Sequence, residues 1–548
     1  MVNNMNIDLF ADFAFINGSV ITVNKDNEIV SALAIKDNKI IYVGDDEGIT
    51  PYIGEKTIVT NLSGKTLMPG FVEAHSHFML NAILLNNIVI PIDYKICKSI
   101  EDIKEIIKRE VKVRKKGEWI ILQGYDQNKL KELRHPNYKD LDEVAPDNPV
   151  WCVRADLHTG VCNSKALEMV GWTKESAKNF QPGELDLDEN GELTGLVKEE
   201  GFGYMNSVIT YNDEKLLEAY KLCNDMFVKY GITSVHDAGA YGGQFVKVLQ
   251  TACLKGDVKI RVYEMIYRML GKYSIRDFIY EHIKTGLHTG IGNEHYKLGP
   301  AKLLIDGSSS APSCSTKEPY SHNPNLPQII NWTEEEMVKI FTDAHLAGFQ
   351  ITAHCIGDNA VEKMVNTIEK VLTKYPREDA RPRIEHCALI NEELLKRIKK
   401  LGIIPISNPG LVAFNAKDYN VYYGDRVERM FSHKWYVDKG IIAAAGADAP
   451  CMEVNPMLGI WGAVARKDIV NGVECGISQR IPLMDAIRMF TINGAYASFD
   501  EKIKGSLEVG KLADFIILKE DILKSPVDHL KDIQVEETYI DGKLVYKD

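Results

Sequence analysis

Short apolar runs alternate with amphipathic stretches through most of this 548-residue chain. The amphipathic stretches have the 3.6-residue period of helices, and each is followed by a strand-like apolar run. This alternation predicts a βα barrel, to which we assign residues 65–499. The clearest pairs, helix first, are 216–230 with 232–236, 334–347 with 351–354, 360–374 with 384–386, and 426–439 with 441–446.

Both ends of the chain follow a different pattern, with short apolar runs separated by turn residues. Asn17-Gly18 near the start and Asp541-Gly542 near the end are typical hairpin turns. We therefore expect residues 1–64 and 500–548 to pair into one small composite β-domain. Residues from about 105 to 215 exceed what one βα unit needs, which predicts an insertion that covers the barrel mouth.

Composition narrows the class of protein without naming a reaction. The chain is 45% hydrophobic and 26% charged, and its net charge of −12 opposes binding to nucleic acid or to anionic membranes. No apolar run is long enough to span a bilayer, and the first residues do not resemble a signal peptide. The ten cysteines contain no Cys-x-x-Cys pair, which favours reduced thiols and a cytoplasmic location.

The first candidate site is the pair His75-Ser76-His77, which directly follows the apolar run 67–74. Side chains alternate along a strand, so the two imidazoles point to the same side and can reach one metal ion. The end of a barrel strand is also where such folds keep their chemistry. Alone, the pair is weak evidence for a metal site, because such pairs arise by chance and often only form hydrogen bonds within a core.

Three further residues extend this pair, because His354, His386 and Asp448 each follow an apolar strand-like run. The carboxyl ends of parallel barrel strands lie at one face, so we expect these side chains to converge there. Histidine and carboxylate ligands suit Zn²⁺ and similar divalent ions. Water bound to such an ion ionises at a pH of about 7, and Asp448 could accept the proton.

Lys302 lies inside the apolar run 299–307, where a lysine is costly unless it is paired or chemically changed. Two interpretations stay open from the residues alone. One is a lysine whose amine reaches solvent at the barrel end, and the other is a CO₂-derived carbamate that bridges two ions.

The order His-x-His, Lys, His, His, Asp resembles the amidohydrolase superfamily. The sequence motifs around these residues resemble its YtcJ-like branch, amidohydrolase family 3, which includes N-substituted formamide deformylase. The resemblance covers about residues 10 to 545 and rests on 67–77, 163–167, 233–239, 302–307, 354–360, 383–386, 446–450 and 510–514.

The resemblance implies a (β/α)8 TIM-like barrel of the metal-dependent hydrolase type, with a β-sandwich built from both termini. It implies one or two divalent ions, with Zn²⁺ expected. His75 and His77 would bind the first ion and His354 and His386 the second. A carboxylated Lys302 would bridge them, and Asp448 would be ligand and general base. His158 matches a position near the substrate, and a homodimer is expected.

The candidate ligands predict metal-dependent chemistry, and the resemblance implies that the chain is an amidohydrolase that cleaves a non-peptide carbon–nitrogen bond, an amide or N-substituted formamide, of a small molecule. The sequence of the loop 307–312 departs from the family's usual motif, so the identity of the substrate is not predicted. One alternative is a hydrolytic deaminase with a single ion, which would not need Lys302. An alternative of another class is a barrel that binds a small ligand without turnover.

Overall fold

Eight parallel strands form the centre of the computed structural model, which describes residues 10–92, 97–155, 159–269 and 271–548. Their spatial order follows their order in the chain, which is the arrangement of a TIM-like barrel, so the predicted fold class is confirmed. Nearly all strand residues are buried, as expected where helices cover a parallel sheet. The strands are β8 (Phe71–Ser76), β15 (Ile232–Asp237), β16 (Arg261–Ile266), β17 (Tyr296–Leu304), β18 (Ile351–Cys355), β19 (Arg383–His386), β20 (Ile404–Ser407) and β21 (Ala444–Ala445).

The barrel closes where the segment after β21 meets the end of β8. The Asp448 amide donates to the His75 carbonyl at 2.8 Å, and the His77 amide donates to the Ala449 carbonyl at 2.8 Å. Gly446 fits here only because it lacks a side chain: a Cβ would lie 2.4 Å from Glu73 Oε1 and 2.5 Å from the His75 nitrogen. Closure of the barrel therefore places Asp448 beside the two histidines of β8.

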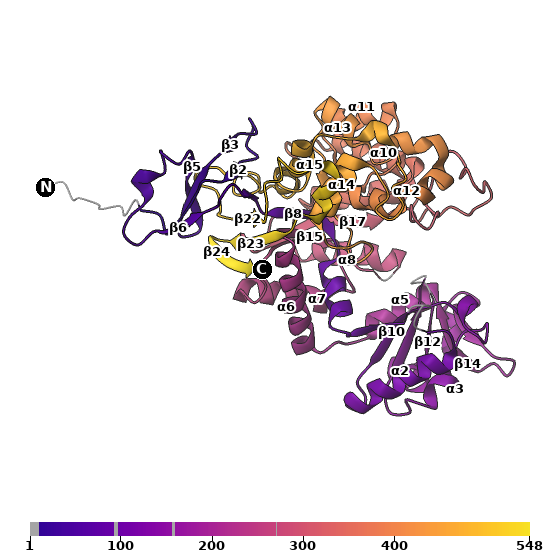
Figure 1. The fold of residues 1–548 in the computed structure, drawn as a ribbon. Helices are drawn as coiled ribbons and strands as arrows, with labels where there is room; N and C mark the ends of the chain where they lie inside the picture. The colour runs from indigo at the N-terminus through magenta and orange to yellow at the C-terminus, as the bar shows by residue number, and fades with distance from the viewer. Residues whose placement is uncertain (1–9, 93–96, 156–158, 270) are drawn as a thin grey trace.

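Helices follow the barrel strands along the chain and surround them (Figure 1). The predicted single helix over 426–439 is wrong: a short 3₁₀ helix (Gly424–Arg429) precedes α13 (His433–Lys439), because Phe431 adopts φ 48°, which a helix cannot contain. In the described part of the chain, no helix combines the length and the apolar character needed to cross a bilayer. The helices are α1 (Phe78–Leu85), α6 (Asp213–Lys229), α7 (Gly243–Lys255), α8 (Lys272–Lys284), α9 (Glu334–Leu346), α10 (Asp358–Lys374), α11 (Glu392–Lys400), α12 (Pro409–Tyr423), α13 (His433–Lys439), α14 (Pro456–Ala465), α15 (Leu483–Met489) and α16 (Ile492–Ala497).

Strands from both ends of the chain form two further sheets beside the barrel (Figure 1). Phe15 packs edge-on against Phe515, with ring centroids 5.2 Å apart, and Phe515 stacks on Tyr539 at 4.5 Å, so residues from both ends share one core. The domain boundaries expected from the sequence stay predictions. One sheet has the order β5 (Lys39–Gly44), β4 (Ala32–Lys36), β1 (Phe13–Ile16), β6 (Ile58–Asn61); the other has β24 (Lys543–Lys547), β23 (Val535–Ile540), β22 (Phe515–Leu518), β7 (Thr66–Pro69), β2 (Ser19–Ile21), β3 (Ile29–Val30).

A separate lobe follows the first barrel strand and lies at the lower right in Figure 1. Its sheet begins at Val89, before the predicted start of an insertion at about residue 105. Ile103 and Ile107 of α2 pack on this sheet in a core of their own. The order is β13 (Leu185–Leu187), β14 (Leu193–Lys198), β12 (Thr159–Cys162), β11 (Val150–Arg154), β10 (Ile120–Tyr125), β9 (Val89–Pro91), with α2 (Ile100–Val113), α3 (Tyr138–Asp142), α4 (Ser164–Val170) and α5 (Glu199–Val208).

Candidate metal centre and adjoining cavity

Five of the predicted metal ligands and Lys302 lie at the carboxyl-terminal ends of barrel strands. The ligand atoms of His75, His386 and Asp448 all lie within 4.8 Å of one another. Asp448 Oδ1 is 3.4 Å from His75 Nε2 and 3.8 Å from His77 Nε2. The His354 ring centroid lies 4.4 Å from that of His386. The side chains thus form one cluster, as the strand-end argument requires. His158, the remaining predicted site residue, lies outside the described residues.

Hydrogen bonds fix how three of the histidine rings are oriented. Nδ1 of His75 contacts Glu385 Oε2 at 2.5 Å, Nδ1 of His77 contacts the Gly239 carbonyl at 2.8 Å, and Nδ1 of His386 contacts Asn408 Oδ1 at 2.7 Å. Each partner accepts the Nδ1 proton, which leaves the Nε2 lone pair for another ligand. In this tautomer a histidine binds a metal ion through Nε2.

His354 is oriented differently, because its Nε2 contacts the Gly307 carbonyl at 3.1 Å and lies 3.6 Å from Asp306 Oδ1. Nδ1 is therefore the nitrogen it can offer to an ion. Gly307 begins the loop 307–312, whose sequence departs from the family's usual motif. That loop thus contacts one of the predicted ligands through its backbone.

The electrostatics of the cluster also suit a divalent ion. Burial lowers the pKa of His77 to about 3 and that of His354 to about 4, so both rings are neutral at pH 7. Burial by itself would raise the pKa of Asp448, but its contacts with His75 and the nearby His386 and His77 hold it below the usual range. Neutral imidazoles and an ionised carboxylate are the forms that bind divalent metals.

Lys302 lies inside the same cluster and is 2% exposed. Its Nζ is 3.5 Å from His75 Nε2 and 3.4 Å from the Ala238 carbonyl, and it lies 4.8 Å from the centre of the Tyr267 ring. Burial lowers the pKa of its amine, against the opposing charges of Glu385 and Asp448. The side chain therefore points into the barrel mouth and does not reach out to solvent.

Two of the cluster residues have a strained backbone. His386 has φ 67° and Asp448 has φ 59°, in the left-handed region that costs a residue with a side chain about 1–2 kcal/mol. Along a regular strand, His386 would face away from Glu385. The turn at His386 instead brings its ring within 4.8 Å of the His75 ring.

The sequence analysis missed Glu385, whose carboxylate orients the His75 ring through Nδ1. Its carboxylate also accepts hydrogen bonds from Thr352 Oγ1 at 2.6 Å and from Arg383 Nε and Nη2 at 2.9 and 3.0 Å. Arg383 contacts His236 Nδ1 at 3.0 Å as well. Burial would raise the pKa of Glu385, but Arg383 and His75 keep it well below its usual range, so the carboxylate is charged. Alternation already places Arg383 and Glu385 on one face of the strand, and this signal could have identified them.

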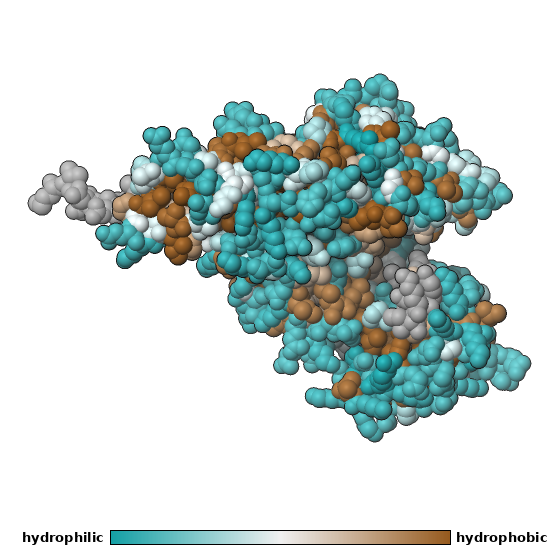
Figure 2. Space-filling view, in the orientation of Figure 1, coloured by the Kyte–Doolittle hydropathy of each residue, from teal (hydrophilic) through white to brown (hydrophobic). Residues whose placement is uncertain are grey.

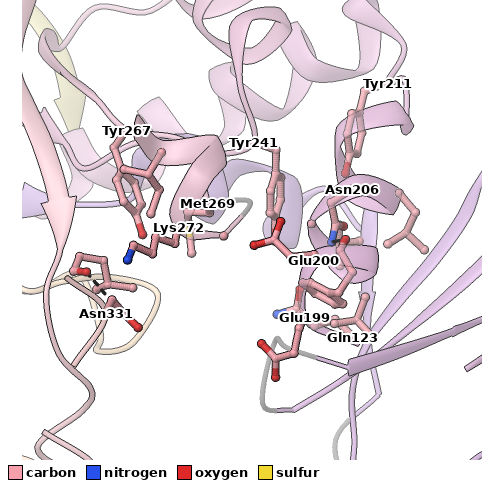
Figure 3. Close-up of a pocket in the computed structure, with 18 of the residues that line it drawn as sticks. Gln123, Glu199, Glu200, Asn206, Tyr211, Tyr241, Tyr267, Met269, Lys272 and Asn331 are labelled. Atoms are coloured by element: carbon pink, nitrogen blue, oxygen red, sulfur yellow. Dashed lines mark hydrogen bonds between the residues drawn. The ribbon is translucent and has the colours of Figure 1, made fainter. Parts of the chain in front are cut away.

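A cavity of about 360 Å³ lies between the barrel and the lobe (Figure 3). Apolar side chains line both bodies where they meet, as the brown surface in Figure 2 shows. Tyr267, which follows β16, lines the cavity and also covers Lys302. Leu304, the last residue of β17, lines it too and pairs in register with His354. The cavity therefore adjoins the cluster, and its volume is that of a small-molecule site.

The fold and the cluster together define a hydrolase barrel that uses a divalent metal, and comparisons with known proteins agree. The model of the amidohydrolase family (Amidohydro_3) matches residues 59–546, so the chain belongs to this family and is a hydrolase that acts on carbon–nitrogen bonds. It is 27% identical to the putative amidohydrolase YtcJ of Bacillus subtilis, with 97% of this chain and 98% of YtcJ covered.

Two other similar proteins extend this result. The N-substituted formamide deformylase of Arthrobacter pascens is 26% identical, with 98% of each chain covered. The crystal structure of an uncharacterised metal-dependent hydrolase from Pyrococcus horikoshii has a TM-score of 0.75 and is 26% identical, with 94% of this chain and 99% of that chain covered. The match thus extends over the whole fold.

Proposed function

We propose that this chain hydrolyses an amide or an N-substituted formamide of a small molecule at the His–Asp cluster. The convergence of His75, His386 and Asp448 ligand atoms within 4.8 Å carries the proposal. The similarity to a formamide deformylase over nearly the full length of both chains supports this substrate class.

The cluster divides the chemistry between the metal and the chain. A divalent ion, Zn²⁺ in our proposal, would polarise the carbonyl and activate water. His75, His77, His354 and His386 would hold it through the nitrogens identified above. Asp448 is ionised in the folded protein, so its carboxylate can take a proton from water and return it to the leaving nitrogen.

We further propose that Lys302 carries a carbamate that bridges two ions. Its Nζ lies 3.5 Å from His75 Nε2, and among the described residues no carboxylate lies within ion-pair distance of it. A buried lysine with this position can contribute a ligand only after its cationic charge is removed.

Metal analysis together with an activity screen on N-acyl and N-formyl compounds tests the proposal. The wild type should hold stoichiometric divalent metal and turn over members of the panel, whereas Lys302→Ala should lose one ion and nearly all activity. Lys504→Ala is a matched control, because Lys504 is also buried, but it contacts Ser234 and Asp500 and no residue of the cluster. Retention of both ions and of activity in Lys302→Ala would contradict the bridge.

Amino-substituted rings added to the screen separate the alternatives. One ion per chain, with release of ammonia from amino-substituted rings, would favour the single-ion deaminase. A protein that holds no stoichiometric metal and hydrolyses nothing in the panel would favour a ligand-binding barrel.

A further inference from the structure

The cavity between barrel and lobe has charged groups of opposite sign on its two sides (Figure 3). Lys272, at the start of α8, approaches from the barrel. Glu200, in α5, approaches from the lobe. A ligand in this cavity therefore lies between a lysine on the barrel side and a carboxylate on the lobe side.

Lys272 is already paired, whereas Glu200 has no ion-pair partner among the described residues. Lys272 Nζ lies 2.9 Å from both carboxylate oxygens of Glu336 and 4.8 Å from the centre of the Trp332 ring. Among the described residues, no cation lies within 4.0 Å of the Glu200 carboxylate. Arg268, which shares a neighbouring hollow with Glu200, instead lies over the Phe278 ring and donates to the Ser274 carbonyl. Glu200, which is exposed, thus has a carboxylate that is free to contact a cation in the cavity.

Neighbouring carboxylates strengthen this asymmetry. Burial raises the pKa of Glu200, and the charges of Glu184 and Glu199 raise it further. A cation bound in the cavity would relieve this repulsion.

The walls between the two ends are aromatic, and one of them offers an unused polar group. Tyr267 is 6% exposed, and its hydroxyl, which points into the cavity, has no hydrogen-bond partner in the described part of the chain (Figure 3). Phe202, Tyr211, Tyr241 and Trp332 complete the aromatic lining. Aromatic faces combined with a carboxylate are a recurring way to bind ammonium and guanidinium groups.

We propose that the cavity binds the distal part of the substrate, an apolar or aromatic group that ends in an organic cation. The cation would lie against Glu200 and the aromatic side chains, and the reacting amide would lie at the metal cluster beyond Tyr267. This inference rests on the proposed function, because it takes the cluster to be the place where the amide reacts.

The test compares two compounds of the same shape that differ in one charge. N-formyl-4-(trimethylammoniomethyl)benzylamine carries a permanent cation, and N-formyl-4-neopentylbenzylamine is its neutral isostere. Titration calorimetry on the metal-loaded full chain should show about tenfold or tighter binding of the cationic compound. Glu200→Gln should remove most of that preference. Glu189→Gln, which changes an exposed charge elsewhere on the lobe, should preserve it.

Equal binding of the two compounds by the wild type, or no binding of either, would overturn the inference. So would a cation preference that survives in Glu200→Gln. Tyr267→Phe adds a second readout, because loss of a substrate hydrogen bond should raise KM for both compounds with little change in kcat. A wild type that prefers the cation but hydrolyses neither compound would leave the cavity assignment standing and contradict the proposed function.

Discussion

Replacement of Glu385 by glutamine preserves the shape of the side chain behind His75 but removes its charge. The amide oxygen can still accept the Nδ1 proton of His75, whereas Arg383 loses its charged partner in a fully buried position. We expect the affinity for metal to fall about 10- to 100-fold, which corresponds to about 1.4–2.7 kcal/mol. Breaking the buried ion pair should also cost about 3–5 kcal/mol of folding stability.

Metal affinity is measured by competition with a chromophoric chelator, and stability by denaturation of the metal-free protein. Thr352→Val is the matched control, because it removes the 2.6 Å hydrogen bond to Glu385 and leaves the contact with His75 in place. It should cost about 1.5–3 kcal/mol of stability but change metal affinity less than about threefold. Wild-type metal affinity in Glu385→Gln, or equal losses of affinity in both variants, would refute the reasoning.

Three further predictions concern the ion pair between Arg261 of β16 and Asp514, and the closure of the barrel. Asp514→Asn should lower stability by about 3 kcal/mol, measured from the denaturant midpoint, because buried Arg261 then keeps only Asp541 as a charged partner. Burial by itself would raise the pKa of Asp514, but the charge of Arg261 outweighs it, so the pKa is lowered in the folded state. The ionised carboxylate therefore contributes its full stabilisation above a pH of about 4 and loses it progressively below that pH, so the stability deficit of Asp514→Asn should shrink in acid. A deficit independent of pH would exclude a charge effect. Gly446→Ala should lower the free energy of unfolding by at least about 2 kcal/mol and displace Asp448, which metal analysis would detect as a loss of bound metal. Gly243→Ala is the control, because nothing lies within 4 Å of its Cβ, and it should behave as wild type.

The sequence predicted the barrel because its strands and helices have different apolar periods, yet two of the strands escaped notice. β16 carries Arg261 and Glu264 inside an apolar run, and β20 carries Pro405. Arg261 is buried only because it pairs with Asp514, more than 250 residues later in the chain. A charge whose partner is so distant cannot be recognised as a core residue from local pattern.

In the candidate site, too, local pattern predicted some features and not others. Strand-end positions were enough to group His75, His354, His386 and Asp448, because the barrel brings all strand ends together. The left-handed backbone at His386 and Asp448 and the second contacts of Glu385 depend on packing between strands, which local pattern does not encode. The cavity could not be predicted from the sequence for a similar reason, since the lobe and the barrel each supply part of its lining.

Strand β7 lies between β2 on one side and β22 on the other, within one sheet. Roughly 450 residues of synthesis separate β7 from β22, so at typical translation rates roughly 20 to 90 s elapse before the partner leaves the ribosome. Throughout that interval the nascent chain exposes an apolar strand edge, a feature that invites intermolecular pairing. Expression conditions that slow elongation should therefore increase aggregation of this protein, and chaperones that shield early strands should relieve it.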